Sequence, residues 1–243
     1  MKNIHLRQTS KQNWKNIELH FDASDENLLR STHEGVLNEH LTHYNSRLIE
    51  FIVKNDIKRV LDFGCGDGKV LYAFALMYPN INFVGVDLSE ENINLATEKF
   101  SAPNISYHRV VGSVNDLSNL GKFDLIFSFS VVQYFDTQSM SILIKQLIDL
   151  LNDDGALVHM SIPNLNHFYR FDIPDTLSFV SFFKASVKLL LHSFDKNKHF
   201  GGNGYWWSKN SLLNTHDKYF ESVCCLSSDS WYRFDLICIG KKN

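Results

Sequence analysis

The sequence predicts an α/β protein built on a doubly wound, mostly parallel sheet, with helices on both faces and an antiparallel hairpin at its C-terminal end. Short apolar runs alternate with helical patterns through the middle of the 243-residue chain, as in successive parallel β-α-β units. The last two apolar runs are joined by so short a polar link that they must form antiparallel neighbours. A glycine-rich turn follows the first apolar run, at the place where open parallel sheets bind ligands.

The predicted elements follow one another in a regular order. Apolar positions at helical spacing predict a first helix over residues 34–54, and residues 1–57 are expected to form an N-terminal helical cap segment. Residues 58–243 are expected to form the main domain, with a helical insertion at about residues 164–207 after the fifth strand. Strands are predicted at residues 59–63, 81–86, 105–111, 123–129, 156–162, 220–226 and 233–239. Helices are predicted at residues 69–77, 89–100, 138–151 and 208–219, with a turn at residues 152–155.

Composition and charge limit the partners and the compartment. With 44% hydrophobic and 21% charged residues, the chain has the composition of an ordinary globular protein. The net charge of -3 and the lack of a long Lys/Arg run make nucleic acid an unlikely partner. The four cysteines contain no C-x-x-C pair, and no metal site is expected. The polar N-terminus has no signal-peptide core, so a cytoplasmic location is expected.

The segment from Gly64 to Gly68, with the sequence Gly-Cys-Gly-Asp-Gly, is the most informative part of the chain. Glycines let the backbone turn sharply off the first strand and let a ligand approach closely. Asp87 ends the next strand about 20 residues further on, where a carboxylate can accept hydrogen bonds from both hydroxyls of a ribose. Together these features predict a nucleoside-type binding site.

The residues around this loop favour S-adenosylmethionine over a nicotinamide dinucleotide. A dinucleotide site requires G-x-G-x-x-G, which aims a helix N-terminus at a pyrophosphate, but Lys69 stands where the last glycine would be. Asp62, two residues before the first glycine, would repel a pyrophosphate and would suit the sulfonium and ammonium groups of S-adenosylmethionine.

These residues resemble the motifs of the class I, Rossmann-like S-adenosylmethionine-dependent methyltransferases. Residues 62–68 are similar to the first motif of that family, residues 84–89 to the second, residues 123–128 to the fourth-strand motif and residues 150–156 to the turn before strand five. The resemblance implies a seven-stranded sheet and a methyltransferase that uses S-adenosyl-L-methionine and releases S-adenosyl-L-homocysteine.

The resemblance also implies roles for individual residues. The backbone of Gly64, Cys65 and Gly66 would contact the methyl donor, Asp87 the ribose and Leu88 the adenine. Further donor contacts are expected from Asp62, Ser113, Val114, Ser128 and Gln133. At Ser113 the sequence departs from the family, because many relatives place an acid there to bind the adenine amino group.

Three residues are candidates for acceptor chemistry: His199, His167 and Tyr134. If the acceptor is a hydroxyl, one of the histidines would serve as general base, although each alone is more typical of a surface or hydrogen-bonded structural histidine. His159, within the fifth strand, is expected in the core. Trp206 and Trp207 would either stack on a planar acceptor or pack the insertion onto the domain.

Within the insertion, residues 176–194 have a wide apolar helical face. It is expected to form a pocket lid, a dimer contact or a peripheral membrane contact, with the first two favoured.

The expected function is S-adenosylmethionine-dependent O-methylation of a small-molecule or sugar/glycan hydroxyl by direct displacement. The Asp/Asn-Pro-Pro-Tyr motif of enzymes that methylate exocyclic amines is replaced here by Ser128-Phe129-Ser130-Val131. Two alternatives remain: a non-catalytic donor-binding subunit and, less favoured, a nicotinamide-dependent oxidoreductase.

Overall fold

The computed structural model describes residues 48, 52, 55–110, 114–167, 183, 187, 205–228 and 232–242. The strands are β1 Arg59–Phe63, β2 Asn82–Asp87, β3 Ile105–Arg109, β4 Phe123–Phe129, β5 Leu151–Pro163, β6 Phe220–Ser227 and β7 Arg233–Lys241. The α-helices are α4 Lys69–Met77, α5 Glu90–Lys99, α6 Thr137–Ile148 and α9 Lys209–His216. Short 3₁₀ helices are η1 Val114–Leu120, η2 Val132–Tyr134 and η3 Leu165–His167.

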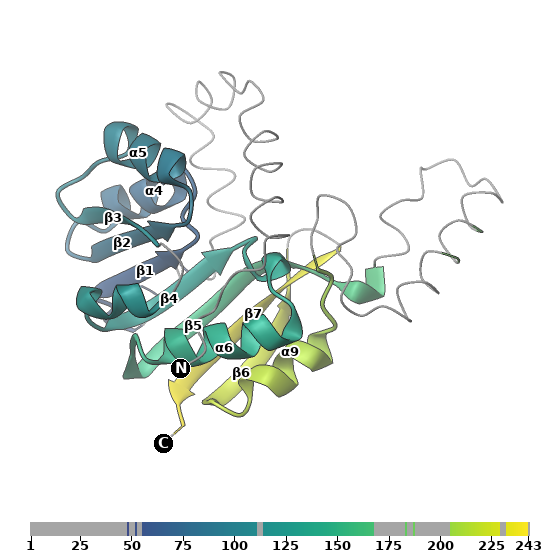
Figure 1. The fold of residues 1–243 in the computed structure, drawn as a ribbon. Coiled ribbons are helices and arrows are strands. Elements are labelled where there is room, and N and C mark those ends of the chain that lie inside the picture. The colour runs from purple at the N-terminus through teal and green to yellow at the C-terminus, as the bar shows by residue number, and fades with distance from the viewer. Residues whose placement is uncertain are drawn as a thin grey trace.

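The strands form one seven-stranded sheet in the order β3-β2-β1-β4-β5-β7-β6 (Figure 1). Strands β1 to β5 pair in parallel, whereas β7 runs antiparallel to both β5 and β6. The predicted fold class, including the C-terminal hairpin, is confirmed.

The region between α6 and β5 differs from the prediction. α6 ends at Ile148, and β5 begins at Leu151, so the predicted turn at residues 152–155 lies within the strand. Residues 152–154 are exposed, and the pairing of β4 with β5 shifts register between Phe123 and Leu125. The polar residues therefore form an irregular, solvent-facing stretch of strand, because a shift in register lets their side chains remain in water while pairing continues on either side.

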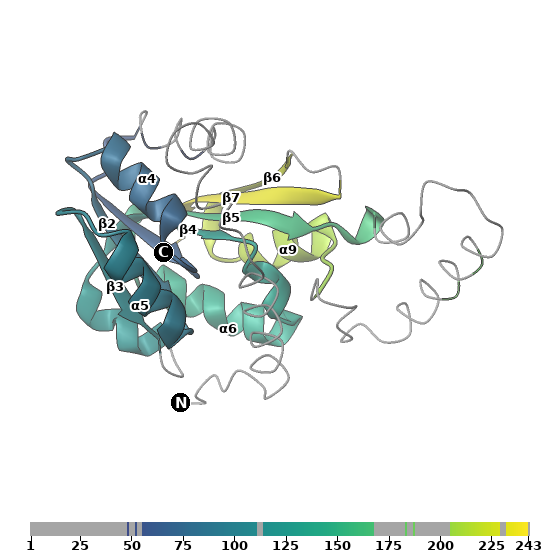
Figure 2. The ribbon, with the colours of Figure 1, turned by 90° about the horizontal axis from the view of Figure 1, so that it is seen from above.

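Helices cover the two faces of the sheet and enclose a core on each (Figure 2). On the α4 face the core contains large aromatic side chains, including Phe74, Phe83 and Phe127. On the other face η1, α6 and α9 bury side chains such as Ile144 and Leu212. Burying each such side chain contributes roughly 1.5–3 kcal/mol, so both helical layers stabilise the sheet.

Of the predicted N-terminal helix over residues 34–54, Leu48 and Ile52 are described. Both are helical, both are buried, and both belong to the core on the α4 face. They are four positions apart, which is the spacing of one helix face. The rest of that helix lies outside the described residues.

Most of the predicted insertion at residues 164–207 also lies outside the described residues. Within residues 176–194, Phe183 and Val187 are described as helical, and their side chains are 65% and 40% exposed. The roles considered for this segment, a lid, a dimer contact or a membrane contact, remain predictions. Among the described residues, none of the helices has the length and apolar character that crossing a membrane demands.

The topology defines the edge at which a ligand site is expected. The carboxyl ends of β1, β2, β4 and β5 share one edge, and the strand order reverses direction at β1, between β2 and β4. Ligands of open α/β sheets bind at such a switch point. Because β7 is antiparallel, it contributes its first residue, Arg233, to the same edge.

Candidate functional site

The turn that leaves β1 is held against the end of β2. The backbone N–H groups of Gly64 and Cys65 both donate to the carbonyl oxygen of Val86, at 2.8 and 3.0 Å. Gly64 and Gly66 have φ angles of +86° and +55°, which L side chains rarely adopt. The glycines therefore permit a turn tight enough for the loop to bond β2.

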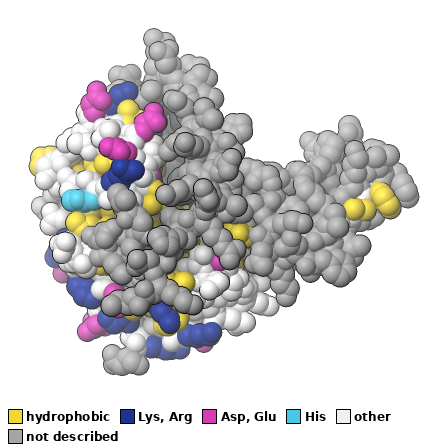
Figure 3. Space-filling view, viewed as in Figure 1, with side chains coloured by type: hydrophobic (Ala, Val, Ile, Leu, Met, Phe, Trp, Pro, Cys, Tyr) yellow, Lys and Arg dark blue, Asp and Glu magenta, His cyan; other side chains and the backbone are white. Residues whose placement is uncertain are grey.

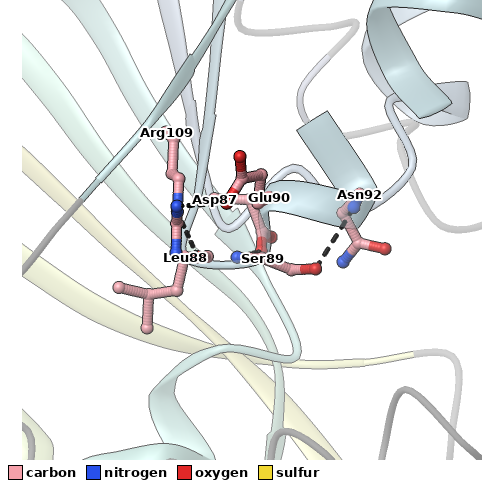
Figure 4. Close-up of polar contacts among 6 residues, drawn as sticks. All are labelled: Asp87, Leu88, Ser89, Glu90, Asn92 and Arg109. Carbon is pink, nitrogen blue, oxygen red and sulfur yellow. Dashed lines mark hydrogen bonds and ion pairs between the residues drawn. The ribbon is translucent and has the colours of Figure 1, made fainter. Parts of the chain in front are cut away.

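Asp87 joins this loop to the beginning of α5. Its Oδ2 accepts the backbone N–H of Gly66 at 2.9 Å. Its Oδ1 accepts the N–H of Ser89, also at 2.9 Å (Figure 4). Burial raises the pKa of the Asp87 carboxyl, and the backbone N–H groups that donate to it act in the opposite direction. The carboxylate is thus fixed at the end of β2 before any ligand arrives.

The glycine loop is filled on one side and open on the other. A Cβ atom built at Gly64 would lie 2.4 Å from Cγ2 of Val131, so that side of the loop packs against the segment after β4. A Cβ atom built at Gly66 would meet no atom of the described residues within 4 Å. The N–H groups of Gly64, Cys65 and Gly66 all donate within the protein, and the carbonyl oxygen of Cys65 accepts the N–H of Gly68, so the space beside Gly66 is the part of the loop left for a ligand.

Asp62 adds an uncompensated buried carboxyl group below the loop. Its side chain is 3% exposed, and its Oδ1 has no hydrogen-bond partner among the described residues. Burial raises the pKa of Asp62 well above its ordinary value, and the nearby charge of Asp87 raises it further. A bound cation would offset both effects, so the two carboxyl groups fit a positively charged nucleoside ligand.

Of the predicted donor contacts Leu88, Ser113 and Val114, only Leu88 has a described side chain. Leu88 is half-buried, and its carbonyl oxygen accepts a hydrogen bond from Arg109 Nε, while the Arg109 guanidinium pairs with Glu90 (Figure 4). Ser113 lies outside the described residues. Val114 begins η1, but its side chain is also outside the description.

Two predicted donor contacts have their polar atoms engaged within the protein. Ser128 is 1% exposed, and its Oγ lies 2.8 Å from Nδ1 of His159 on β5. Gln133 is buried, with its Nε2 3.2 Å from the Tyr134 hydroxyl and its Oε1 3.1 Å from Nη1 of Arg233. Their roles toward the donor remain predictions. The expected core position of His159 is confirmed.

Of the three residues predicted for acceptor chemistry, the structure describes Tyr134 and His167. Tyr134 is buried in η2, and burial raises the pKa of its hydroxyl. His167 is half-buried at the end of η3, and its backbone N–H donates to Asn164 O. His199 lies outside the described residues.

The tryptophan pair packs onto the domain. Trp206 and Trp207 are 6% and 4% exposed, and Trp207 Nε1 donates to the carbonyl oxygen of Val132. Trp207 belongs to the core on the α6 face. Of the two roles considered for the pair, packing is the one that the structure shows for Trp207.

Sequence reasoning missed Arg233, Ser130 and Ser161. Arg233 Nη1 contacts both serines at the carboxyl edge of β4 and β5. The predicted antiparallel direction of the last strand was the signal available for Arg233, because it puts the start of that strand at the ligand-binding edge. Within the described ranges, no group of three or more His, Cys, Asp or Glu side chains is arranged to hold a metal ion.

A family model described as a methyltransferase domain matches residues 60–155, which include β1 to β4, the glycine loop and Asp87. Over these residues the chain is similar to the class I methyltransferases in sequence and in fold. The match agrees with the family predicted from the motifs, and a solved methyltransferase that shares the fold holds S-adenosylhomocysteine or S-adenosylmethionine.

Curated relatives match part of the chain. The malonyl-[acyl-carrier protein] O-methyltransferase of Priestia megaterium is 30% identical over 105 residues, which are 43% of this chain and 37% of that protein. An uncharacterized protein of Rickettsia prowazekii is 34% identical over 112 residues, 44% of this chain and 45% of that protein. The matched segments span 45% or less of the length of the first three of these relatives.

Solved structures share the fold at low identity. A Pyrococcus horikoshii protein has a TM-score of 0.61 and 18% identity, covering 86% of this chain and 93% of its own. The magnesium protoporphyrin IX methyltransferase of Synechocystis, solved with S-adenosylhomocysteine, has a TM-score of 0.56 and 15% identity, covering 98% and 96%. These likenesses support the fold.

Proposed function

We propose that this protein transfers a methyl group from S-adenosylmethionine to a hydroxyl oxygen of a small molecule or glycan. The observation that carries the proposal is the buried carboxyl group of Asp62, without a partner for Oδ1 in the described part of the chain, beside a glycine loop that Asp87 ties to β2. A site with two buried carboxyl groups suits a nucleoside that carries positive charge.

The protein's own part in the reaction is binding, alignment and exclusion of water. Bound S-adenosylmethionine supplies an electrophilic methyl group, which the acceptor oxygen takes by direct displacement as the carbon–sulfur bond breaks. Asp87 holds the ribose hydroxyls, Asp62 favours the positive charge, and Leu88 packs against the adenine. The hydroxyl proton passes to a general base, for which His167 and His199 are the candidates.

Three relatives named as malonyl-[acyl-carrier protein] O-methyltransferases support oxygen as the acceptor atom. Another relative is named as a probable tetrahydroprotoberberine N-methyltransferase. The curated matches therefore span oxygen and nitrogen acceptors, so the class of acceptor has to be measured.

Calorimetry on the full chain tests the donor. We expect S-adenosylmethionine and S-adenosylhomocysteine to bind and NAD(H) to give no heat of binding. Binding of NAD(H) in their place would favour the oxidoreductase alternative and contradict the proposal.

Transfer of a labelled methyl group from S-adenosylmethionine to a panel of phenols, hydroxy acids and free sugars tests the reaction. We expect labelled product with at least one hydroxyl acceptor. Saturable donor binding with no transfer to any acceptor, including amines, would favour the non-catalytic subunit.

A further inference from the structure

Arg233 is anchored at the edge where β4 and β5 end. Its Nη1 lies 3.1 Å from Gln133 Oε1, 3.3 Å from Ser161 Oγ and 3.4 Å from Ser130 Oγ, and it also donates to the carbonyl oxygen of Ser161. One nitrogen of the guanidinium is therefore held by the segment after β4 and by β5 together.

The backbone is strained at the two serines that contact Nη1 of Arg233. Ser130 and Ser161 have φ angles of +56° and +59°, and both contact Arg233. The pairing of β5 with β7 also shifts register between His159 and Ile162, which places an irregularity at Ser161. Non-glycine residues rarely adopt a positive φ, and such strain and bulges cluster at ligand sites.

The charge of Arg233 has no counter-charge in the described part of the chain. The side chain is half-buried, and no described carboxylate forms an ion pair with it. Asp235, two residues along β7, accepts the N–H of Ser161 through Oδ1. A partly desolvated cation surrounded by neutral acceptors favours an anion nearby.

The unused nitrogens have the right geometry for a carboxylate. An arginine has five N–H donors, and those of Nη1 are taken up by the serines and Gln133. Among the described residues no hydrogen bond joins Nε or Nη2. These two nitrogens form a planar fork that matches the two oxygens of a carboxylate.

Contacts through Ser130 and Val131 connect Arg233 to the glycine loop. Ser130 touches Arg233, and the next residue, Val131, fills the space beside Gly64. Gln133, another Arg233 partner, contacts the hydroxyl of Tyr134. The segment that holds Arg233 therefore packs against the glycine loop.

We propose that Arg233 binds a carboxylate of the methyl acceptor, so that the acceptors of this protein are hydroxylated carboxylic acids rather than neutral molecules. The inference rests on the proposed function. The carboxylate anchors the acceptor at the β7 side, and its hydroxyl is turned toward the donor.

The test measures binding and needs no turnover. The full chain, loaded with S-adenosylhomocysteine, is titrated by calorimetry with 4-hydroxybenzoate, glucuronate and lactate, each against its uncharged amide. For at least one pair we expect the carboxylate to bind about tenfold or more tightly than the amide, the size of effect of a hydrogen-bonded charge.

The variants assign the preference to the arginine. Arg233→Met should remove it, and Arg233→Lys, which keeps the charge but loses the fork, should reduce it at least about threefold. Lys218→Met is the matched control, because Lys218 is exposed just before β6 at the opposite edge of the sheet, and it should keep the full preference.

The outcomes separate this inference from the proposed function. No preference in any pair, or a preference that survives Arg233→Met, would overturn the role of Arg233. If Arg233→Met does not fold, an unchanged preference in Arg233→Lys overturns it. Failure of the wild-type chain to bind S-adenosylhomocysteine would instead contradict the proposed function.

Discussion

The rings of His159 on β5 and His216 on α9 meet edge to face, with their centroids 5.4 Å apart, in the core beneath the sheet. Both side chains are at most 1% exposed. Each ring is bonded through Nδ1, to Ser128 Oγ and to Leu212 O respectively, and in the described part of the chain neither Nε2 has a partner. Burial lowers the pKa of His159 well below its usual value and that of His216 to about 4.

This pair predicts loss of stability in acid. Because the pKa of His216 is lower in the folded than in the unfolded protein, its stabilising effect is complete above about pH 6.5 and is lost as the pH falls toward 4. Between pH 7 and 4.5, urea unfolding should show that the wild type loses about 2 kcal/mol more than His216→Gln. The partly exposed His108, changed to Gln, serves as control and should follow the wild type. Equal losses in wild type and His216→Gln would contradict the prediction.

Asp87→Asn should weaken donor binding. The amide cannot accept from two ribose hydroxyls as a carboxylate can, so the free energy of S-adenosylhomocysteine binding should fall by roughly 1–3 kcal/mol, measured by calorimetry. Asp87 also binds Gly66 and Ser89, so folding stability must be measured in parallel. Ser208→Ala, which removes the N-cap of α9, controls for stability loss alone and should leave donor affinity unchanged. Wild-type affinity in Asp87→Asn would exclude Asp87 from the site.

Gly66→Ala should weaken donor binding by more than its loss of folding stability explains. An added methyl group meets no protein atom within 4 Å there but projects into the space assigned to the donor. Gly121→Ala is the matched control, since Gly121 also has positive φ and its Cβ atom would meet the flexible end of Arg59. Both variants should lose about 1–2 kcal/mol of folding free energy, from melting or urea curves, because of backbone strain. Gly66→Ala alone should bind S-adenosylhomocysteine more weakly, and equal affinity in both variants would rule out the open side of the loop as the site.

Asp62 should make donor binding depend on pH. Its carboxyl pKa is raised in the ligand-free protein, and a bound cation favours the ionised form, so binding should release protons and strengthen with rising pH. Calorimetry from about pH 5 to about pH 8, in two buffers of different ionisation enthalpy, measures both effects. Asp62→Asn should bind S-adenosylmethionine more weakly and with less pH dependence. If the variant keeps the wild-type pH profile, the dependence arises from another group.

Much of the local structure was predictable because short-range physics determines it. Ser89, the first residue of the helix predicted at residues 89–100, is the N-cap of α5, and its Oγ accepts the N–H of Asn92 at 3.1 Å. The glycine turn after β1 and the acid at the end of β2 followed from residue types with few conformational alternatives. The antiparallel hairpin followed from the length of its link. These features depend on neighbours in the sequence.

The orientation of side chains at the ligand-binding edge depended on long-range pairing. Ser128 stands opposite His159, and this register sets its hydroxyl against an imidazole in the core. Arg233 reaches the same edge because β7 pairs antiparallel with β5, which sets Arg233 opposite Pro163. Periodicity in the sequence locates a strand, but which residues of two strands stand opposite each other is fixed by tertiary packing, and that pairing decided which groups can meet a substrate.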